Sequence, residues 1–164
     1  MPYLATLILA AALASSVPVQ ADKFRKPVPW IEVDLSKLEP GQMMALNVVG
    51  GPFHIVRRTE GQITLLEMQY GDRELRSGDP RYFVVKAFNV RSNCILGFVR
   101  PGDPRWKGRK VSQSGGFADV CSCAEYDLTG RLVVPGCAAP SMLDIPPHEF
   151  LGPDRVRVGR APEA

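Results

Sequence analysis

Four cysteines and two histidines are the residues of this 164-residue chain best suited to bind a metal or form a covalent cross-link. The cysteines all lie in the second half of the chain, at Cys94, Cys121, Cys123 and Cys137. The two histidines stand apart from them, His54 in a strand-like stretch and His148 in a proline-rich one. An even number of cysteines favours disulfides in an oxidising compartment, and the sequence leaves their pairing open.

A metal site is the alternative use of the same four cysteines. Structural zinc sites usually draw on cysteine pairs with a short spacer of about two to four residues. Here a single residue separates Cys121 from Cys123, while Cys94 and Cys137 stand alone. The spacing therefore favours disulfides over a four-cysteine zinc or [2Fe–2S] site, with free or redox-active thiols as a third use.

The composition indicates one globular domain and excludes several classes of function. Hydrophobic residues make up 45% of the chain and charged residues 23%, and the net charge is +3. So small a charge, carried by dispersed basic residues, argues against nucleic-acid binding. The sequence also lacks the glycine-rich, metalloprotease and serine-hydrolase motifs that would indicate a nucleotide site or a common hydrolase.

The N-terminal residues 1–21 predict a segment that directs export. They carry an uncharged run rich in Ala and Leu, followed by the small-residue pattern Val19-Gln20-Ala21, which is typical of a signal-peptidase site. No positive charge precedes the run, whereas basic residues follow it. A retained membrane anchor through residues 4–17 therefore stays open beside a cleaved signal peptide.

Both interpretations place the rest of the chain outside the cytoplasm, in the periplasm or on the periplasmic face of the inner membrane. Residues 22–30, charged and rich in proline, predict an extended linker. We expect one domain over residues 31–160 and a short tail over residues 161–164.

Short apolar and alternating stretches predict a mainly β domain. Strands are expected at Ile31–Leu35, Met43–Val49, Phe53–Arg58 and Tyr82–Val90, at short stretches within Phe117–Val134, and at an edge strand Arg155–Val158. Ile63–Glu67 fits either a strand or a short helix, and Arg100–Gly116 predicts a long loop. Many short strands separated by turns favour an all-β antiparallel sandwich or small barrel.

Several stretches resemble, in the same order, the Rieske iron–sulfur subunit of the cytochrome bc complex (ubiquinol–cytochrome c reductase). They read IEVDLSKLEPGQ, GGPFHIVRRT, SGGFADVCSCAEYDLTGRL, GCAAPSMLDIP and DRVRVG, and extend from about Ile31 to Gly159. The resemblance implies a Rieske-type fold with a subdomain like the one that binds the cluster in that family.

The resemblance also implies where cluster ligands would stand. A Rieske centre is a [2Fe–2S] cluster held by two cysteines and two histidines. In the family, the motifs C-T-H-L-G-C and C-P-C-H-G-S each supply one cysteine and one histidine, and their remaining cysteines form a disulfide between the two loops. The first motif aligns with residues 93–98, so that Asn93 takes the place of the ligand cysteine and Ile95 that of the ligand histidine.

The second motif aligns in two ways, and neither supplies a histidine. A match without gaps places Asp119 at the ligand cysteine, Cys121 at the disulfide cysteine and Ser122 at the ligand histidine. A gapped match places Cys121 and Cys123 on the motif cysteines and Ala124 at the histidine. We therefore expect no [2Fe–2S] cluster and no other metal.

The disulfides expected from this alignment join the same two loops through different residues. Cys94 would pair with Cys121 or Cys123, and Cys137 would take the remaining cysteine of the second loop. Between the two motifs, a basic segment surrounds a tryptophan and fits either a solvated loop or a docking surface for an acidic partner. Its residues are Arg105, Trp106, Lys107 and Arg109.

The leading functional hypothesis is a Rieske-fold accessory subunit of a respiratory membrane complex. It would have no redox chemistry and no enzymatic activity of its own, with cytochrome b and cytochrome c subunits as partners implied by the resemblance. One alternative is an electron-transfer protein whose [2Fe–2S] cluster is held by Cys94, Cys121, Cys123 and Asp119. Another is a free periplasmic binding module.

Overall fold

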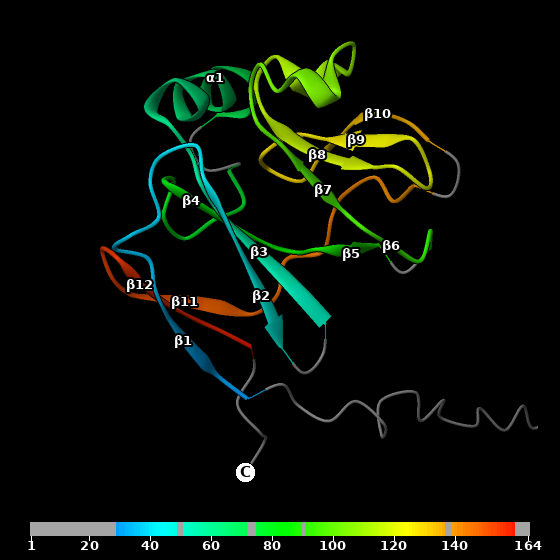
Figure 1. Cartoon of the computed structure of the whole chain (residues 1–164). Helices are drawn as coiled ribbons and strands as arrows, with labels where there is room; N and C mark the ends of the chain where they lie inside the picture. Colours follow the sequence, from blue (N-terminus) through cyan, green and yellow to red (C-terminus); the bar gives the residue numbers. More distant parts are fainter. Residues whose placement is uncertain (1–28, 49–50, 72–74, 90, 137–138, 160–164) are drawn as a thin grey trace, which may run out of the picture.

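The structure is a computed structural model that describes residues 29–48, 51–71, 75–89, 91–136 and 139–159 (Figure 1). Within these residues, antiparallel strands form four small sheets, which confirms the all-β class. The strands are β1 (Ile31–Asp34), β2 (Met43–Val48), β3 (Gly51–Arg57), β4 (Tyr82–Lys86), β5 (Phe88–Asn89), β6 (Cys94–Ile95), β7 (Gly97–Val99), β8 (Gly116–Asp119), β9 (Ala124–Tyr126), β10 (Leu132–Val134), β11 (His148–Gly152) and β12 (Arg155–Val158).

Two three-stranded sheets, β1-β12-β11 and β2-β3-β4, enclose one hydrophobic core. Leu35, Ile55, Val84 and Val156 are fully buried there. The expectation of an edge strand at the C-terminal end is wrong, because β12 pairs with β1 on one side and with β11 on the other. The central place of β12 explains why Val156 and Val158 are buried.

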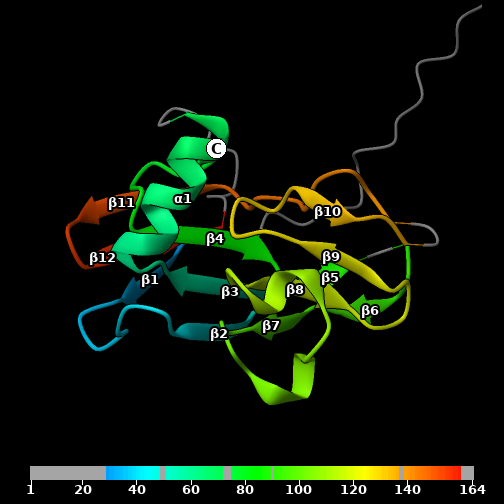
Figure 2. The same ribbon diagram turned by 90° about the horizontal axis from the view of Figure 1, so that it is seen from above.

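The second core lies between the β3–β4 surface, the helix α1 (Glu60–Tyr70) and the four-stranded sheet β10-β9-β8-β7. Figure 2 shows α1 beside the four-stranded sheet, on the side where the β4 strand also lies. Phe83, Phe117 and Tyr126 are fully buried in this core. The four-stranded sheet is thereby fixed to the rest of the domain.

The stretch around Ile63–Glu67, for which a strand or a helix was expected, is helical. Thr59 and Gln62 form a capping box at its start: the Thr59 hydroxyl accepts from the Gln62 amide at 3.2 Å, and Gln62 Oε1 accepts from the Thr59 amide at 2.9 Å. Gln62 Nε2 also donates to the Ser114 carbonyl at 2.9 Å. The cap therefore ties the helix to the long loop before β8.

The single strand expected over Tyr82–Val90 is divided at Ala87. Its amide donates to the Pro52 carbonyl, and its carbonyl accepts from the Leu96 amide, each at 2.7–2.8 Å. The chain then enters β5, which pairs with β6, so Asn89 comes to lie opposite Cys94. Val90 lies outside the described residues.

Arg58 connects segments that are far apart in sequence. Its guanidinium, 2% exposed, donates to the carbonyls of Leu75, Pro80, Tyr82 and Leu128 at 2.7–3.2 Å. Burial lowers the pKa of Arg58 to about 10, against the opposing charges of Asp127 and Asp79. The five hydrogen bonds satisfy a cation that would be costly to bury alone.

The segment Arg100–Gly116 is mostly irregular, as expected, but contains two 3₁₀ turns, η2 (Pro104–Trp106) and η3 (Lys110–Ser112). No helix in the described part of the chain is long and apolar enough to cross a membrane. The expected signal or anchor at residues 1–21, most of the linker and the tail lie outside that part, and their boundaries stay predictions.

Candidate functional site

Two loops meet at one end of the four-stranded sheet. One joins β5 to β6, and the other joins β8 to β9. A disulfide between Cys94 and Cys121 links them, with the two Cα atoms 6.2 Å apart. The expected cross-link between the loops is confirmed, and Cys121 is its partner in the second loop.

Of the other two cysteines, Cys123 lies among the described residues and Cys137 does not. Cys123 is exposed and has no disulfide partner among the described residues. Cys137 lies outside the described residues, so a second disulfide stays a prediction. A shallow hollow beside the second loop is lined by Cys121, Ser122, Cys123, Pro135 and Gly136.

Asp119, the last residue of β8, is the centre of the site. Its side chain is fully buried, and its two carboxylate oxygens accept four hydrogen bonds. From the first loop, Asn89 Nδ2 donates at 2.7 Å and Ser92 Oγ at 2.6 Å. From the second loop, the amides of Cys121 and Ser122 donate at 3.0 and 3.2 Å. One carboxylate thus holds both loops together beside the disulfide.

The hydrogen bonds decide the charge of this carboxylate. Burial alone would raise the pKa of Asp119, but the bonds from Ser92, Asn89 and the Ser122 backbone outweigh burial and lower it below its usual 3.8. Asp119 is therefore ionised at neutral pH, and its four donors satisfy the buried charge.

Two buried hydroxyls beside Asp119 lack partners. Neither Ser122 Oγ nor Tyr126 Oη makes a hydrogen bond of normal geometry. The Ser122 side chain nevertheless lies near enough to Asp119 to help lower its pKa. Burial, followed by the Asp119 charge, raises the pKa of Tyr126 to about 12. Buried polar atoms without partners are rare, and they mark this as a site with unused ligand capacity.

The first-loop positions that the resemblance assigned to cluster ligands face solvent. Asn93 is exposed and adopts a φ of +55°, and Ile95 is 61% exposed. In the second loop, Asp119 and Ser122 point inward and are buried. Because Cys121 forms the disulfide and Asp119 ends β8, the geometry favours the alignment without gaps.

Neither histidine joins the group formed by Cys94, Asp119 and Cys121, whose ligand atoms lie within 4.8 Å of one another. His54 is a buried strand residue in β3, as expected, and its ring stacks on Phe117 at 6.1 Å. His148, in its proline-rich stretch, begins β11, and its Nδ1 lies 2.9 Å from the Pro146 carbonyl.

The site does not fit a Rieske cluster. Such a cluster needs two thiolates and two imidazoles. The sulfurs of Cys94 and Cys121 are bonded to each other, Asp119 offers a carboxylate in place of a thiolate, and no histidine of the described chain lies with them. The site therefore offers neither the two free thiolates nor the two imidazoles that a Rieske cluster needs.

The donors Asn89 and Ser92 were missed from the sequence, where only the substituted ligand positions were identified. They lie 30 and 27 residues before Asp119, and only the β5–β6 hairpin brings them to it. An Asn or Ser in a turn is usually explained by local backbone bonding, so their types alone gave no signal.

The basic segment predicted as a docking surface is partly engaged within the domain. Arg105 pairs with Asp103 at 2.6 Å, and Arg109 lies 3.5 Å from the buried Glu125 carboxylate. Trp106 is half-buried and belongs to a small core with Val99, and a side chain at Gly97 would touch its ring. The tryptophan therefore packs against the four-stranded sheet, while Lys107 is exposed.

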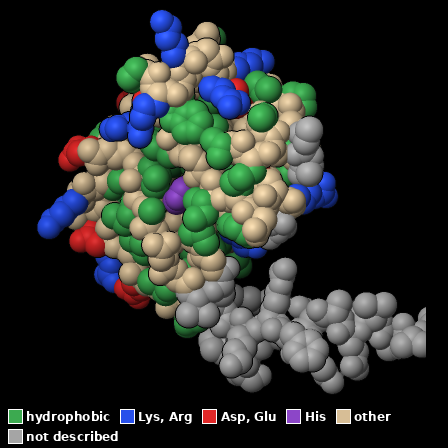
Figure 3. Space-filling view, turned by 45° about the vertical axis from the view of Figure 1, so that its right-hand side comes forward, with side chains coloured by type: hydrophobic (Ala, Val, Ile, Leu, Met, Phe, Trp, Pro, Cys, Tyr) green, Lys and Arg blue, Asp and Glu red, His purple; other side chains and the backbone are tan. Residues whose placement is uncertain are grey.

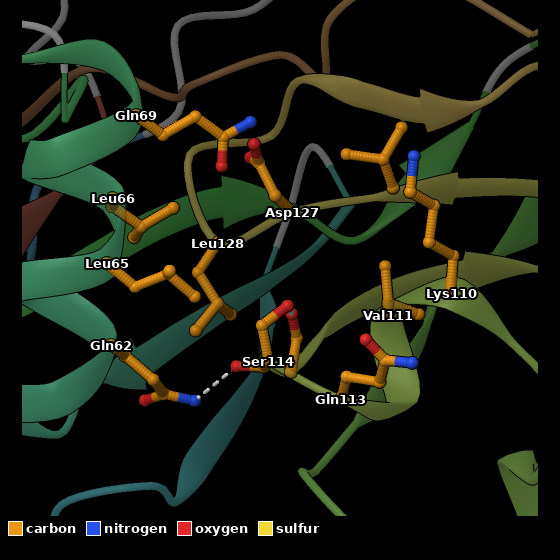
Figure 4. Close-up of a pocket in the computed structure, with 12 residues that line it drawn as sticks. Gln62, Leu65, Leu66, Gln69, Lys110, Val111, Gln113, Ser114, Asp127 and Leu128 are labelled. Atoms are coloured by element: carbon orange, nitrogen blue, oxygen red, sulfur yellow. Dashed lines mark hydrogen bonds between the residues drawn. The ribbon is translucent and has the colours of Figure 1, made fainter.

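A groove of about 270 Å³ runs between α1 and the segment that contains η3 (Figure 4). The Gln62–Ser114 hydrogen bond crosses one end of it, as Figure 4 shows, and Leu65 and Leu66 line its helical side. Asp127, at the far side, accepts from Tyr70 and Thr129. Lys110, which is exposed, also lines the groove, so the lining includes a positive charge.

The amino-acid sequence is similar to curated Rieske subunits. A ubiquinol–cytochrome c reductase iron–sulfur subunit of Blastochloris viridis is 30% identical over 139 residues, which cover 79% of this chain and 70% of that protein. The corresponding subunit of Bradyrhizobium diazoefficiens is 27% identical, with 79% and 71% coverage. The mitochondrial cytochrome b-c1 complex subunit Rieske of Zea mays is 28% identical over 94% of this chain, which spans 55% of the maize protein.

Comparison of folds found a hyperthermophilic respiratory Complex III chain, 20% identical, with a TM-score of 0.49 over 87% of this chain and 82% of that one. No protein-family model matches the sequence. The identity to the Blastochloris viridis protein, over more than two thirds of its length, decides the family. The chain belongs to the family of Rieske iron–sulfur subunits of ubiquinol–cytochrome c reductase.

Proposed function

We propose that this protein is an accessory subunit of a cytochrome bc-type respiratory complex that keeps the Rieske fold and binds no [2Fe–2S] cluster. The observation that carries the proposal is the composition of the loop site. A buried Asp119 with four hydrogen bonds lies at the position that aligns with a ligand cysteine, and the Cys94–Cys121 disulfide lies beside it.

The site already has the cross-links that a cluster would supply to the fold. The disulfide closes a segment of 27 residues, and Asp119 accepts donors from both loops. The domain therefore does not need a metal to hold its loops together, which is the structural requirement for a subunit without a cluster.

The surface supports a role in an assembly. Ile95 and Val120, 61% and 56% exposed, flank the disulfide in sequence. Figure 3 shows a face on which hydrophobic and uncharged side chains occupy the centre, and charged ones gather at the upper and left margins. An apolar centre with a charged rim is typical of a protein–protein interface.

The partners we propose are the cytochrome b and cytochrome c subunits of such a complex, on its periplasmic side. The basic segment Arg105–Arg109 would form a second, electrostatic contact through Lys107 and Arg105. Since Trp106 packs inward, its proposed part is to hold this segment in place.

Iron analysis tests the absence of the cluster. The full chain, purified without oxygen, should be colourless, contain no stoichiometric iron and give no Rieske-type EPR signal after reduction. The iron–sulfur subunit of Blastochloris viridis, purified in the same way, is the positive control. Two irons per chain would reject the proposal and favour an electron-transfer protein with unusual ligands.

Co-purification tests the role in a complex. A tagged full chain, expressed in its own host and isolated from mild-detergent extracts of membranes, should carry cytochrome b and cytochrome c subunits with it. The double variant Ile95→Asp/Val120→Asp, which charges the exposed residues beside the disulfide, should release them. Recovery of the chain alone would show a free periplasmic module instead.

A further inference from the structure

We propose that reduction of the Cys94–Cys121 disulfide converts the loop site into a binding site for a single thiophilic divalent ion of the zinc class. The two sulfurs and one Asp119 carboxylate oxygen would be its ligands, and the disulfide and the ion would exclude each other. The inference concerns a state different from the oxidised one and does not depend on the accessory role proposed above.

The ligand atoms already lie close enough together for one ion. The two sulfurs and a carboxylate oxygen of Asp119 lie within 4.8 Å of one another. Two thiolates on a tetrahedral zinc ion stand roughly 3.8 Å apart, because each Zn–S bond is about 2.3 Å long. The separated sulfurs therefore reach binding distance by small side-chain rotations, since the hairpins already hold their backbones in place.

The site also contains two buried hydroxyls without hydrogen-bond partners. Ser122 Oγ and Tyr126 Oη are buried beside Asp119 and have no hydrogen-bond partner. The ion's remaining coordination position would take a water molecule, and these hydroxyls can hold that water. Buried hydroxyls left without partners in the oxidised state would then be satisfied in the metal-bound one.

The charges of the donor atoms also suit a divalent ion. Two thiolates and a carboxylate together form an anionic donor set, which a divalent ion neutralises in part. The backbone amides of Cys121 and Ser122 already point at Asp119 and would help to orient it. Cys121 is exposed and Cys94 half-buried, so both a reductant and an ion can reach the sulfurs.

Opening of the disulfide requires a dithiol as co-reactant. A dithiol supplies two electrons and two protons, the Sγ–Sγ bond breaks, and two thiols form while the dithiol becomes a disulfide. Ion binding then releases the two thiol protons and forms two metal–sulfur bonds. A disulfide compound as oxidant reverses the sequence: it takes two electrons from the thiolates and two protons from water to become a dithiol, the Sγ–Sγ bond forms again, and the ion leaves.

Cobalt(II) is the probe, because its thiolate charge-transfer and tetrahedral d–d bands report ligand type and geometry. The full chain is reduced with a phosphine, which takes its oxygen from water, and is then titrated with Co²⁺ without oxygen. We expect one ion per reduced chain with two thiolate ligands, and no such bands from the unreduced chain. Equal binding before reduction would overturn the proposal.

Two variants assign the ligands. Asp119→Asn should weaken binding of Co²⁺ to the reduced chain by at least about tenfold, since even supporting groups around a metal contribute that much. Cys123→Ser/Cys137→Ser, the matched control, keeps only the two proposed sulfur ligands and should bind as the wild type does. Unchanged affinity in Asp119→Asn would reject the site, as would loss of binding in the control.

The control also covers the case in which Asp119→Asn does not fold. In that case the Cys123→Ser/Cys137→Ser control must still bind one Co²⁺ through two thiolates, with tetrahedral d–d bands and unchanged far-UV circular dichroism. If it does not, the proposal fails. These results are independent of iron content and of co-purification with cytochromes, so failure here leaves the proposed accessory role untouched.

Discussion

Asp119 replaces a metal ligand by a hydrogen-bonded charge, and its removal should show how much of the site depends on it. Asp119→Ala leaves four donors without an acceptor. Two of these donors, Asn89 Nδ2 and the Ser122 amide, are buried. We expect the free energy of unfolding to fall by about 3 kcal/mol, measured by urea titration of the oxidised protein. Glu39→Ala, at an exposed turn position, should change it by less than about 0.5 kcal/mol.

The Asp119 carboxylate also makes the free energy of unfolding depend on pH in the acidic range. Because the folded pKa of Asp119 is lowered below 3.8, its contribution is fully present above that pH and is lost as the pH falls through the lower folded value. The stability difference between wild type and Asp119→Asn should therefore shrink only below pH 3.8. A difference that is constant down to strongly acidic pH would contradict this account.

His54 predicts pH dependence in a higher range. Burial lowers its pKa from 6.5 to about 4, so the folded protein keeps a neutral ring that the unfolded chain protonates. Stability should fall as the pH decreases from 6.5 towards 4, by up to about 3 kcal/mol. Unfolding midpoints of His54→Leu should lack this slope, whereas His148→Gln, which removes the other histidine, should keep it.

At the scale of elements, the cap of α1 shows how one helix end is fixed to the long loop before β8. Thr59→Ala removes one half of the capping box and should cost about 1 kcal/mol. Gln62→Ala should cost more, because it also removes the bond to Ser114. Met68→Ala, at a position 80% exposed on the same helix, should stay within about 0.5 kcal/mol in the same urea titration.

The elements also show how far the sequence was informative. Short apolar or alternating stretches located β1, β2 and β3, and β9 and β10 lie within the expected stretch Phe117–Val134, because these signals are local. The division at Ala87 and the central place of β12 depend on partners far along the chain. β11 lies between proline-rich stretches and shows little alternation, so its role as the second neighbour of β12 was not predicted.

The site likewise has one part that the sequence predicted and one part that it did not. The register of the second motif pointed to Asp119, Cys121 and Ser122, and their burial or cross-linking follows that register. What Asp119 does depends on Asn89 and Ser92, which reach it through hairpin geometry. The identities of the substituted positions could be predicted, but the network that replaces the ligands could not.

At the scale of the whole molecule, stability should depend on sulfur oxidation and not on iron. A disulfide that closes a segment of 27 residues contributes about 3–4 kcal/mol by constraining the unfolded chain. Thermal unfolding of the full chain should shift to lower temperature with a phosphine reductant or in Cys94→Ser/Cys121→Ser. Treatment of the oxidised chain with an iron chelator should leave it unchanged, and a marked loss of stability would argue for a bound metal.

Arg58 has a consequence for motion across the domain. Its guanidinium donates to the carbonyls of Pro80, just before β4, of Tyr82, at the start of β4, and of Leu128, in the turn after β9. The four-stranded sheet therefore cannot separate from the β2-β3-β4 sheet without breaking these hydrogen bonds. The two parts should therefore open together. Native-state hydrogen exchange should give amides in β3 and β9 one common opening free energy, and Arg58→Lys should divide it into two.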